Sequence, residues 1–259
     1  MKFEIRVNGK YSEDLDFVRD IPKMFKKSEG KLILNSRNIV RSFPELGFVA
    51  KEFHKINFIN KFVYSYLRKS KAQRSYEYAQ RLIENGFGSP EPVAYINVKS
   101  GPMGLNCFPM LLHTSFYICR ECTWDSLYNV LNSNPSEHTE VIVKAYVADV
   151  LRMHDCGIAP IDTNPGNVFY HVDGNEIHFQ YIDLNRMHLF NGGASMSARS
   201  KSLSRITNND SMFEHVASMY FNMHFAGDAG KVEDAMNLCR SHREKFFAKQ
   251  RMKDSLKKL

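Results

Sequence analysis

Two aspartates and an asparagine near the middle of the chain have the types and the order that phosphate transfer requires. Asp162 is followed five residues later by Asn167, and Asp183 ends the next apolar run. Kinase-type sites present, in this order, a carboxylate that accepts the proton of a hydroxyl, then an amide and a carboxylate that hold magnesium. The pattern predicts transfer of phosphate from ATP to a hydroxyl group, with Mg²⁺ bound alongside the nucleotide.

A predicted β-hairpin brings the two magnesium ligands together. Residues 167–170 and 177–182 are β-prone and flank Asp173-Gly174, a strong hairpin signal. A turn centred there places Asp183 opposite residues 164–165, and neighbouring strands lie about 4.8 Å apart. The carboxylate and the asparagine amide can then converge on one cation, and such a sparse oxygen set suits magnesium. Each residue alone could merely shape a turn, so the prediction rests on their joint order.

The composition favours a cytoplasmic globular protein. The 259 residues are 43% hydrophobic, which is enough for one two-lobed unit with a core. The sequence has no apolar run of about 18 residues, and residues 1–6 alternate charged and apolar types instead of forming a signal-peptide core. The cysteines are odd in number and irregularly spaced, which indicates free thiols in a reducing compartment. They are Cys107, Cys119, Cys122, Cys156 and Cys239. The lone Cys119-x-x-Cys122 pair gives little support to a zinc or redox site.

The formal net charge of +7 indicates an acidic partner. Nucleic acid, an anionic membrane surface and a phosphorylated or carboxylated substrate all satisfy this charge. No zinc-finger spacing or aromatic RNA-binding motif is present, so we expect no nucleic-acid partner. The sequence gives no indication of oligomeric state.

The first part of the chain is expected to form an antiparallel meander. Residues 31–34, 39–43 and 48–53 are short apolar runs separated by turn-rich segments. The third run contains Val49-Ala50-Lys51, which matches the pattern of a strand lysine that holds ATP phosphates. An ordinary edge-strand lysine is the alternative interpretation of Lys51.

An amphipathic helix is predicted over residues 58–69. Apolar side chains recur there at helical spacing and basic side chains surround them. Such a helix could lie on an anionic membrane, but we expect its stripe to pack on its own domain.

A second helix is predicted over residues 70–85, with Gly86 after its end. A carboxylate on this helix could form an ion pair with Lys51 and so position it over the phosphates. Glu77 is favoured over Glu84, because Glu84 lies in the last turn, where the helix dipole disfavours an anion.

A hinge is expected at Arg120, Glu121 and Cys122, with a backbone that would contact adenine. It divides the chain into an N-terminal nucleotide-binding lobe, residues 1–120, and a C-terminal catalytic and substrate lobe, residues 121–259. The second lobe should be mainly helical. Its first long helix is predicted over residues 136–153, and His154 after it is expected to be a packed structural residue.

Several segments together resemble a known family. They are Val49-Ala50-Lys51, residues 68–79 and 86–95, the loop 162–167 and Asp183-Leu184-Asn185-Arg186. The chain resembles the lipopolysaccharide core kinases, the Kdo and heptose kinase superfamily, and is most similar to the Bacteroidetes members, over about residues 31–220. The resemblance implies a two-lobed α+β protein-kinase-like fold, with an antiparallel sheet lobe followed by a mainly helical lobe.

The resemblance also implies a substrate and a place of action. Lipopolysaccharide core kinases phosphorylate a sugar hydroxyl, here expected to be on the Kdo of Kdo-lipid A, at the inner face of the cytoplasmic membrane. This acidic glycolipid would account for the basic surface, and the protein would be peripheral to the anionic membrane.

Site roles follow from the resemblance residue by residue. Asp162 would orient and deprotonate the acceptor hydroxyl, while Asn167 and Asp183 would hold magnesium. Lys51 would bind the phosphates of ATP and form an ion pair with Glu77.

Three features depart from the usual kinase pattern. No G-x-G-x-x-G loop covers the phosphates, so the turn 35–38 would contact ATP by its amides and Arg37. Pro160 stands where a histidine is common, and Thr163 where a leucine is common. Two other functions are therefore kept open: a kinase-fold binding protein without catalysis, and a phosphotransferase acting on small molecules or proteins.

Overall fold

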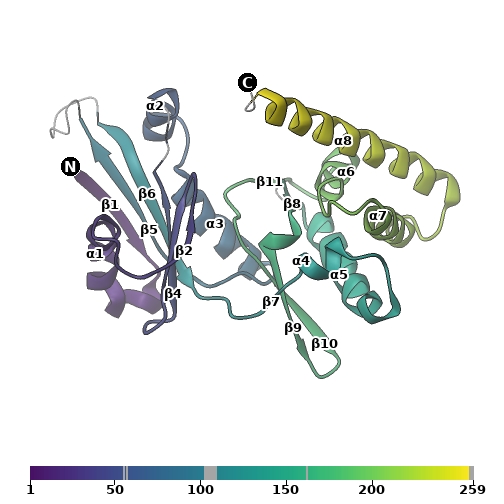
Figure 1. The fold of residues 1–259 in the computed structure, drawn as a ribbon, viewed down its shortest axis with the longest axis horizontal. Coiled ribbons are helices and arrows are strands. Elements are labelled where there is room, and N and C mark those ends of the chain that lie inside the picture. The colour runs from purple at the N-terminus through teal and green to yellow at the C-terminus, as the bar shows by residue number, and fades with distance from the viewer. Residues whose placement is uncertain (55, 57, 102–109, 162, 257–259) are drawn as a thin grey trace. The chain divides into compact units, whose positions relative to one another are not determined.

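The chain forms two compact units, Met1–Thr123 and Trp124–Leu259. The computed structural model describes residues 1–54, 56, 58–101, 110–161 and 163–256. Figure 1 shows that the first unit is built on a sheet and the second is mainly helical. The predicted α+β class, with an antiparallel sheet lobe followed by a helical lobe, is confirmed.

The first unit contains a six-stranded antiparallel sheet with the order β1-β5-β6-β4-β3-β2. Its strands are β1 (Lys2–Val7), β2 (Lys31–Asn35), β3 (Ile39–Phe43), β4 (Phe48–Phe53), β5 (Pro92–Ser100) and β6 (Leu111–Arg120). Its helices are α1 (Leu15–Lys26), α2 (Phe58–Tyr66) and α3 (Lys71–Glu84), and a short 3-10 segment (Gly9–Asp14) precedes α1. The meander predicted from the three apolar runs is confirmed as β2, β3 and β4.

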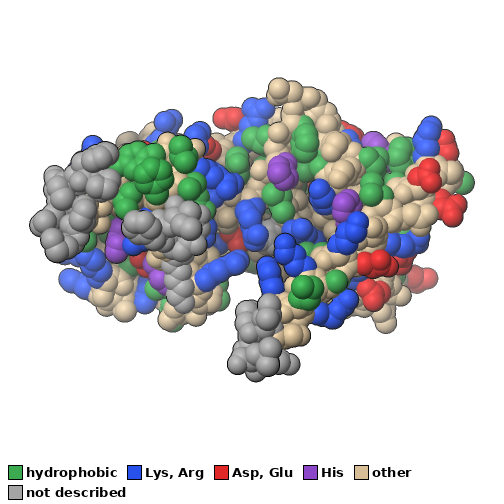
Figure 2. All heavy atoms as spheres, turned by 90° about the horizontal axis from the view of Figure 1, so that it is seen from above, with side chains coloured by type: hydrophobic (Ala, Val, Ile, Leu, Met, Phe, Trp, Pro, Cys, Tyr) green, Lys and Arg blue, Asp and Glu red, His purple; other side chains and the backbone are tan. Residues whose placement is uncertain are grey.

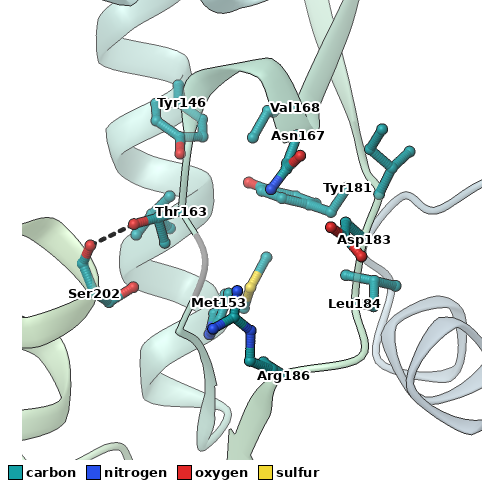
Figure 3. Close-up of a pocket in the computed structure, with 13 residues that line it drawn as sticks. Tyr146, Met153, Thr163, Asn167, Val168, Tyr181, Asp183, Leu184, Arg186 and Ser202 are labelled. Carbon is teal, nitrogen blue, oxygen red and sulfur yellow. Dashed lines mark hydrogen bonds between the residues drawn. The ribbon is translucent and has the colours of Figure 1, made fainter. Parts of the chain in front are cut away.

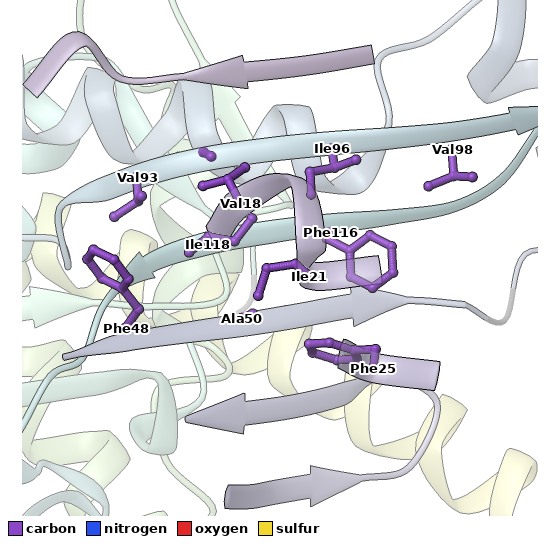
Figure 4. Close-up of a cluster of buried hydrophobic side chains, with 11 residues drawn as sticks. Val18, Ile21, Phe25, Phe48, Ala50, Val93, Ile96, Val98, Phe116 and Ile118 are labelled. Atoms are coloured by element: carbon purple, nitrogen blue, oxygen red, sulfur yellow. The ribbon is translucent and has the colours of Figure 1, made fainter. Parts of the chain in front are cut away.

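Helix α1 covers one face of this sheet. Its apolar stripe, Val18, Ile21 and Phe25, is buried against alternate strand residues such as Ala50 and Ile118 (Figure 4). Because side chains alternate along a strand, the residues between these point to the opposite face. That opposite face carries Lys51, one residue after Ala50.

Helix α3 packs on the face that carries Lys51. Tyr76 of α3 is buried against Phe53 and Tyr95, with the rings of Tyr76 and Tyr95 5.5 Å apart. The helix begins after Ser70, whose hydroxyl accepts a hydrogen bond of 3.0 Å from the amide of Gln73. The sequence-predicted helix 70–85 is thus confirmed to within one residue at each end.

Helix α2 leaves much of its apolar stripe in solvent. Phe62 is 50% exposed, Tyr66 is 46% exposed and Leu67, just after the helix, is 74% exposed. The expectation that the stripe packs on its own domain is therefore wrong for these side chains. The helix is joined to the chain around β6 by two hydrogen bonds: the hydroxyl of Ser65 accepts one of 2.7 Å from the amide of Leu112, and the hydroxyl of Tyr66 donates one of 3.2 Å to the carbonyl of Met110.

The second unit places five helices around two small antiparallel sheets. The helices are α4 (Tyr128–Asn132), α5 (Glu137–Asp155), α6 (Met196–Leu203), α7 (Asp210–His224) and α8 (Ala229–Leu256). The strands are β7 (Asp125–Ser126), β8 (Ile158–Pro160), β9 (Val168–Asp173), β10 (Glu176–Tyr181) and β11 (Met187–Leu189), paired as β10-β9-β7 and β11-β8. A capping box between Ser136 and Thr139 starts α5, close to the predicted start. Within the described ranges, no helix is long and apolar enough to cross a membrane.

Candidate active site

Two strand pairs of the second unit hold the two polar loops side by side. One loop joins β8 to β9 and the other joins β10 to β11; β9 pairs with β10, and β8 pairs with β11. At one end the amide of Ile182 donates to the carbonyl of Asn167 at 2.9 Å, and at the other the amide of Ile161 donates to the carbonyl of Arg186 at 3.2 Å. The chain thus brings the two loops together by backbone pairing at both ends.

The predicted hairpin is confirmed, but its register was wrong. Asp173 pairs with Glu176, so the two-residue loop is Gly174-Asn175 and not Asp173-Gly174. Continuing the observed ladder places Asp183 opposite Gly166 instead of residues 164–165. The physical reason is that Gly174, with φ of +56°, occupies the first loop position, where a positive φ favours glycine.

Asn167 and Asp183 line the same pocket of the second unit (Figure 3). The amide of Asn185 donates a hydrogen bond of 2.6 Å to the carboxylate of Asp183 and so orients it. Asp183 also has a φ of +55°, which is uncommon for a residue other than glycine and which the neighbouring pairing must hold in place. An asparagine amide and an aspartate carboxylate in the lining of one pocket can offer the oxygen ligands that Mg²⁺ prefers.

The described residues offer no cluster of three or more His, Cys, Asp or Glu side chains that could hold a metal ion. A cation at this pocket would therefore rely on one carboxylate and one amide from the protein. Magnesium accepts such a set, because it keeps several waters and takes further oxygens from phosphate groups. The donor set fits a magnesium-nucleotide complex better than a metal caged by protein alone.

Asp162 lies outside the described residues, whereas Pro160 and Thr163 lie within them. Thr163, which is buried, donates a 2.6 Å hydrogen bond from its hydroxyl to the carbonyl of Ser202 in α6. Pro160 ends β8 and pairs with Met187 of β11. Proline fits there because the strand ends at this residue. Both departures from the kinase pattern thus occupy ordered positions on either side of Asp162.

Lys51 lies on β4 in the first unit, and its side chain is half-buried. Its ammonium group lies 5.3 Å from the centre of the Phe53 ring. Pairing across the sheet sets Val40 on one side of it and Tyr117 on the other. Apolar half-buried neighbours beside a strand lysine are a suitable surface for a planar base. The sequence did not predict that Val40 and Tyr117 flank Lys51, because the apolar runs do not reveal the register between strands.

Glu77 lies on α3 as predicted, but its carboxylate is engaged locally. The ammonium of Lys69 contacts its two oxygens at 2.7 and 2.9 Å, and the side-chain amide of Gln73 donates to it at 3.1 Å. Lys69 stands just before the helix, within reach of the outer face of α3. The ion pair between Glu77 and Lys51 stays a prediction.

Arg120, predicted at the hinge, makes contacts that hold the turn before β4. Its guanidinium donates to the carbonyl of Leu46 at 3.0 Å and lies 5.4 Å from the centre of the Phe48 ring. Its amide donates to Glu91, and the next amide, of Glu121, donates to Gly47, each at 2.9 Å. These amides support the sheet edge, so a contact between Arg120 and adenine stays a prediction.

The described cysteines are free thiols, as expected. They are Cys119, Cys122, Cys156 and Cys239, while Cys107 lies outside the described residues. Burial raises the pKa of the Cys119 thiol to about 12, despite the lowering effects of a hydrogen bond from Tyr117 and the charge of Lys51. A thiol with so high a pKa is a poor nucleophile, which argues against redox chemistry at the C-x-x-C pair.

A buried polar network behind the site was missed from the sequence. His154 is fully buried as predicted, and its Nδ1 lies 2.8 Å from the hydroxyl of Tyr220. Arg199 of α6 also donates to that hydroxyl at 2.8 Å and to the carboxylate of Asp155 at 2.7 Å. The network joins α5, α6 and α7, and nothing local in the sequence distinguished Arg199 from the exposed arginines.

Among solved structures that resemble this chain, the WaaP complex supports the fold described above. A structure of WaaP in complex with acyl carrier protein matches with a TM-score of 0.57 and 15% identity, covering 92% of this chain and 99% of that chain. The Rio2 kinase-ADP/Mg2+-phosphoaspartate complex from Chaetomium thermophilum matches with a TM-score of 0.45 and 13% identity, covering 94% of this chain and 82% of that chain. No curated protein matches the chain.

The family comparison covers most of the chain. The model of the lipopolysaccharide kinase (Kdo/WaaP) family matches residues 48–213, a range that contains β4, α3 and both polar loops. The match does not distinguish subgroups, so similarity to the Bacteroidetes members stays a prediction. The chain belongs to the lipopolysaccharide kinase (Kdo/WaaP) family.

Proposed function

We propose that this protein transfers the terminal phosphoryl group of ATP to a sugar hydroxyl of the lipopolysaccharide inner core, on the Kdo of Kdo-lipid A. The observation that carries the proposal is the convergence of Asn167 and Asp183 on one pocket, from two loops held together at both ends. Family membership supplies the substrate class.

The second unit would provide the chemistry. Asp162 accepts the proton of the acceptor hydroxyl as the oxygen attacks phosphorus, and ADP leaves. Asn167 and Asp183 would hold Mg²⁺, which would supply positive charge to the phosphates. Phosphoryl transfer depends chiefly on positioning and electrostatics. The hydrogen bond from Asn185, which orients the carboxylate of Asp183, would therefore contribute to catalysis.

The first unit would bind the nucleotide. Lys51 contacts the phosphates, and the apolar side chains of Val40 and Tyr117 beside it flank the base. Glu77 pairs with Lys51 when nucleotide is bound, which requires it to leave Lys69. The backbone after Arg120 contributes at the hinge.

We further propose that the protein works in the cytoplasm at the inner face of the cytoplasmic membrane. Phe62, Tyr66 and Leu67 are exposed apolar side chains, and the basic Arg68 and Lys69 that follow are also exposed. Apolar side chains next to basic ones suit an anionic lipid surface. The net charge of +7 supports the same partner.

The proposal is tested by phosphate transfer from ATP to Kdo-lipid A, with the wild type and with Asp162→Asn. Wild-type transfer that falls by at least about a hundredfold in the variant supports it, because a positioned base contributes on this order. Undiminished transfer would remove Asp162 as the base. Binding of ATP without transfer to any glycolipid would favour a kinase-fold binding protein.

A further inference from the structure

A second pocket lies beside the loop that contains Asp162. Its walls come from β8, β11 and α6 of the second unit, and its volume is about 240 Å³. We name it the β11–α6 pocket and define it by Ile161, His188, Ser197, Lys201 and Arg205. Since Ile161 directly precedes Asp162 in the chain, a molecule in this pocket is bound against the loop predicted to be catalytic.

Arg205 connects the pocket to that loop. Its guanidinium donates a hydrogen bond of 3.2 Å to the carbonyl of Ile161 and lies 4.5 Å from the centre of the Phe246 ring in α8. The stacking and the hydrogen bond hold the guanidinium at the pocket wall. A fixed guanidinium recognises carboxylate and phosphate groups well, because less side-chain freedom is lost on binding.

The electrostatic environment of the pocket is positive. Lys201 is an exposed cation on its wall, beside the exposed imidazole of His188, and the charges of Lys201, Arg205 and Lys245 extend to His242 of α8. Burial and the charges of Lys201, Lys245 and Arg205 lower the pKa of His242. Figure 2 shows Lys and Arg side chains on the face that carries α8, with Asp and Glu side chains on another part of the same face.

A neighbouring carboxylate does not cancel this charge. Asp155, close to the base of α6, is already bound to Arg199 at 2.7 Å. The hydroxyl of Ser197 adds a neutral hydrogen-bonding group to the pocket wall. Cations, a hydroxyl and an exposed imidazole together form a set that recognises an anion and not a neutral sugar.

We propose that the β11–α6 pocket binds an anionic group of the acceptor, a phosphate monoester or a carboxylate, and so aligns the acceptor hydroxyl with the catalytic loop. This inference rests on the proposed function, and it assigns Lys201 and Arg205 as specificity-determining residues. The phosphates of lipid A and the carboxylate of the sugar acid share the required chemistry. An acceptor that lacks the recognised anionic group should bind more weakly, because it cannot interact with Lys201 and Arg205 in the pocket.

Lys201→Glu is the test variant, because the exposed Lys201 side chain can be reversed in charge without opening the core. Lys144→Glu is the matched control, an exposed lysine on α5 outside the pocket. Arg205 is less suitable, since its loss would also release Ile161. Thermal unfolding of both variants shows that each is folded.

Equilibrium binding of Kdo-lipid A micelles without ATP is measured first, so that the result does not depend on catalysis. Lys201→Glu should weaken binding about tenfold, the scale of one charge-assisted contact, and Lys144→Glu should leave it within about twofold. The difference should shrink at high salt. Equal binding by the two variants would overturn the proposal that this pocket binds the acceptor, even if the wild type transfers phosphate.

Two altered lipids then identify the group that is bound. One is Kdo-lipid A with its phosphates removed, and the other has its carboxylates converted to amides. The penalty of Lys201→Glu should disappear with the lipid that lacks the recognised anion. A penalty that is the same with all three lipids would contradict anion recognition. When transfer occurs, the KM for the acceptor should rise while the KM for ATP stays unchanged.

Discussion

The hydroxyl of Thr163 donates a hydrogen bond of 2.6 Å to the carbonyl of Ser202 and so fastens the loop after β8 to α6. Thr163 directly follows Asp162, at a position where kinase loops often have leucine. Threonine therefore gives this loop a buried polar anchor that leucine could not provide.

Replacing Thr163 with valine should destabilise the second unit. Valine has nearly the same shape but removes this hydrogen bond; because the carbonyl of Ser202 also accepts a 3.4 Å hydrogen bond from the amide of Arg205, the cost is about 0.5–1.5 kcal/mol. Urea unfolding of Thr163→Val measures the loss. Thr163→Ser keeps the hydroxyl but loses the methyl group, and it should recover most of the stability; a larger loss in Thr163→Ser than in Thr163→Val would assign the effect to the methyl group instead.

Replacing Asp183 with alanine should abolish the magnesium-dependent part of ATP binding. Ligand that binds only the folded protein raises the unfolding temperature, so wild type should show a larger shift with Mg-ATP than with ATP alone. Asp183→Ala should show the same small shift in both. Asn175→Ala, in the loop at the far end of the hairpin, is the control and should behave as wild type.

The local elements could be predicted because their signals are local. The apolar runs before and including β4, the glycine-containing hairpin and the periodic stripe of α5 each depend on neighbouring residues alone. The hairpin register failed by one loop position, since Gly174 can supply a positive φ at either place. Because of that shift, Asp183 lies opposite Gly166 and not opposite residues 164–165.

Side-chain partners could not be predicted in the same way. Glu77 has a helical position that permits several cationic partners, and only the folded structure shows that Lys69 reaches it. The buried Arg199 likewise depends on α5, α6 and α7 meeting in space. The Arg199 contacts join segments far apart in the sequence, and a single sequence carries no signal of them.

The engagement of Glu77 by Lys69 allows a direct test of its role. If Glu77 pairs with Lys51 during catalysis, Glu77→Gln should raise the KM for ATP at least about tenfold, because the strand lysine loses its partner. Lys69→Met removes only the local pair and should leave the KM for ATP unchanged or lower. Steady-state kinetics of both variants distinguishes a role for Glu77 in positioning Lys51 from a role in the local pair with Lys69. Equal increases in the KM for ATP would confine Glu77 to the local structural role.

Arg120→Ala should affect stability more than nucleotide binding. The variant loses the hydrogen bond to Leu46 and the contact with Phe48, which together amount to about 1–2 kcal/mol at a partly exposed site. Thermal unfolding and the Kd for ATP are measured on the same preparation. Arg120→Lys retains charge but not the planar contacts. A tenfold loss of ATP affinity in Arg120→Ala alone would show that the side chain, and not only the hinge backbone, binds the nucleotide.

His154 should make the second unit sensitive to mild acid. Burial, with the charge of Arg199 and the proximity of His224, lowers the pKa of His154 to about 3, whereas an unfolded histidine has a pKa of about 6.5. Between these values the unfolded chain binds a proton that the folded chain does not, so stability falls as the pH decreases. The contribution of His154 between pH 7 and pH 5 is about 2 kcal/mol.

Urea unfolding at the two pH values, with His154→Gln as the comparison, isolates this contribution. Glutamine can still reach Tyr220 but has no proton to gain, so the variant should lose less stability on acidification than the wild type does. The burial of His224 and His242 also lowers their pKa values, and they titrate equally in both proteins. Their effect therefore cancels in the difference. The same pH dependence in wild type and variant would show that His154 can be protonated within the folded network with Arg199 and Tyr220.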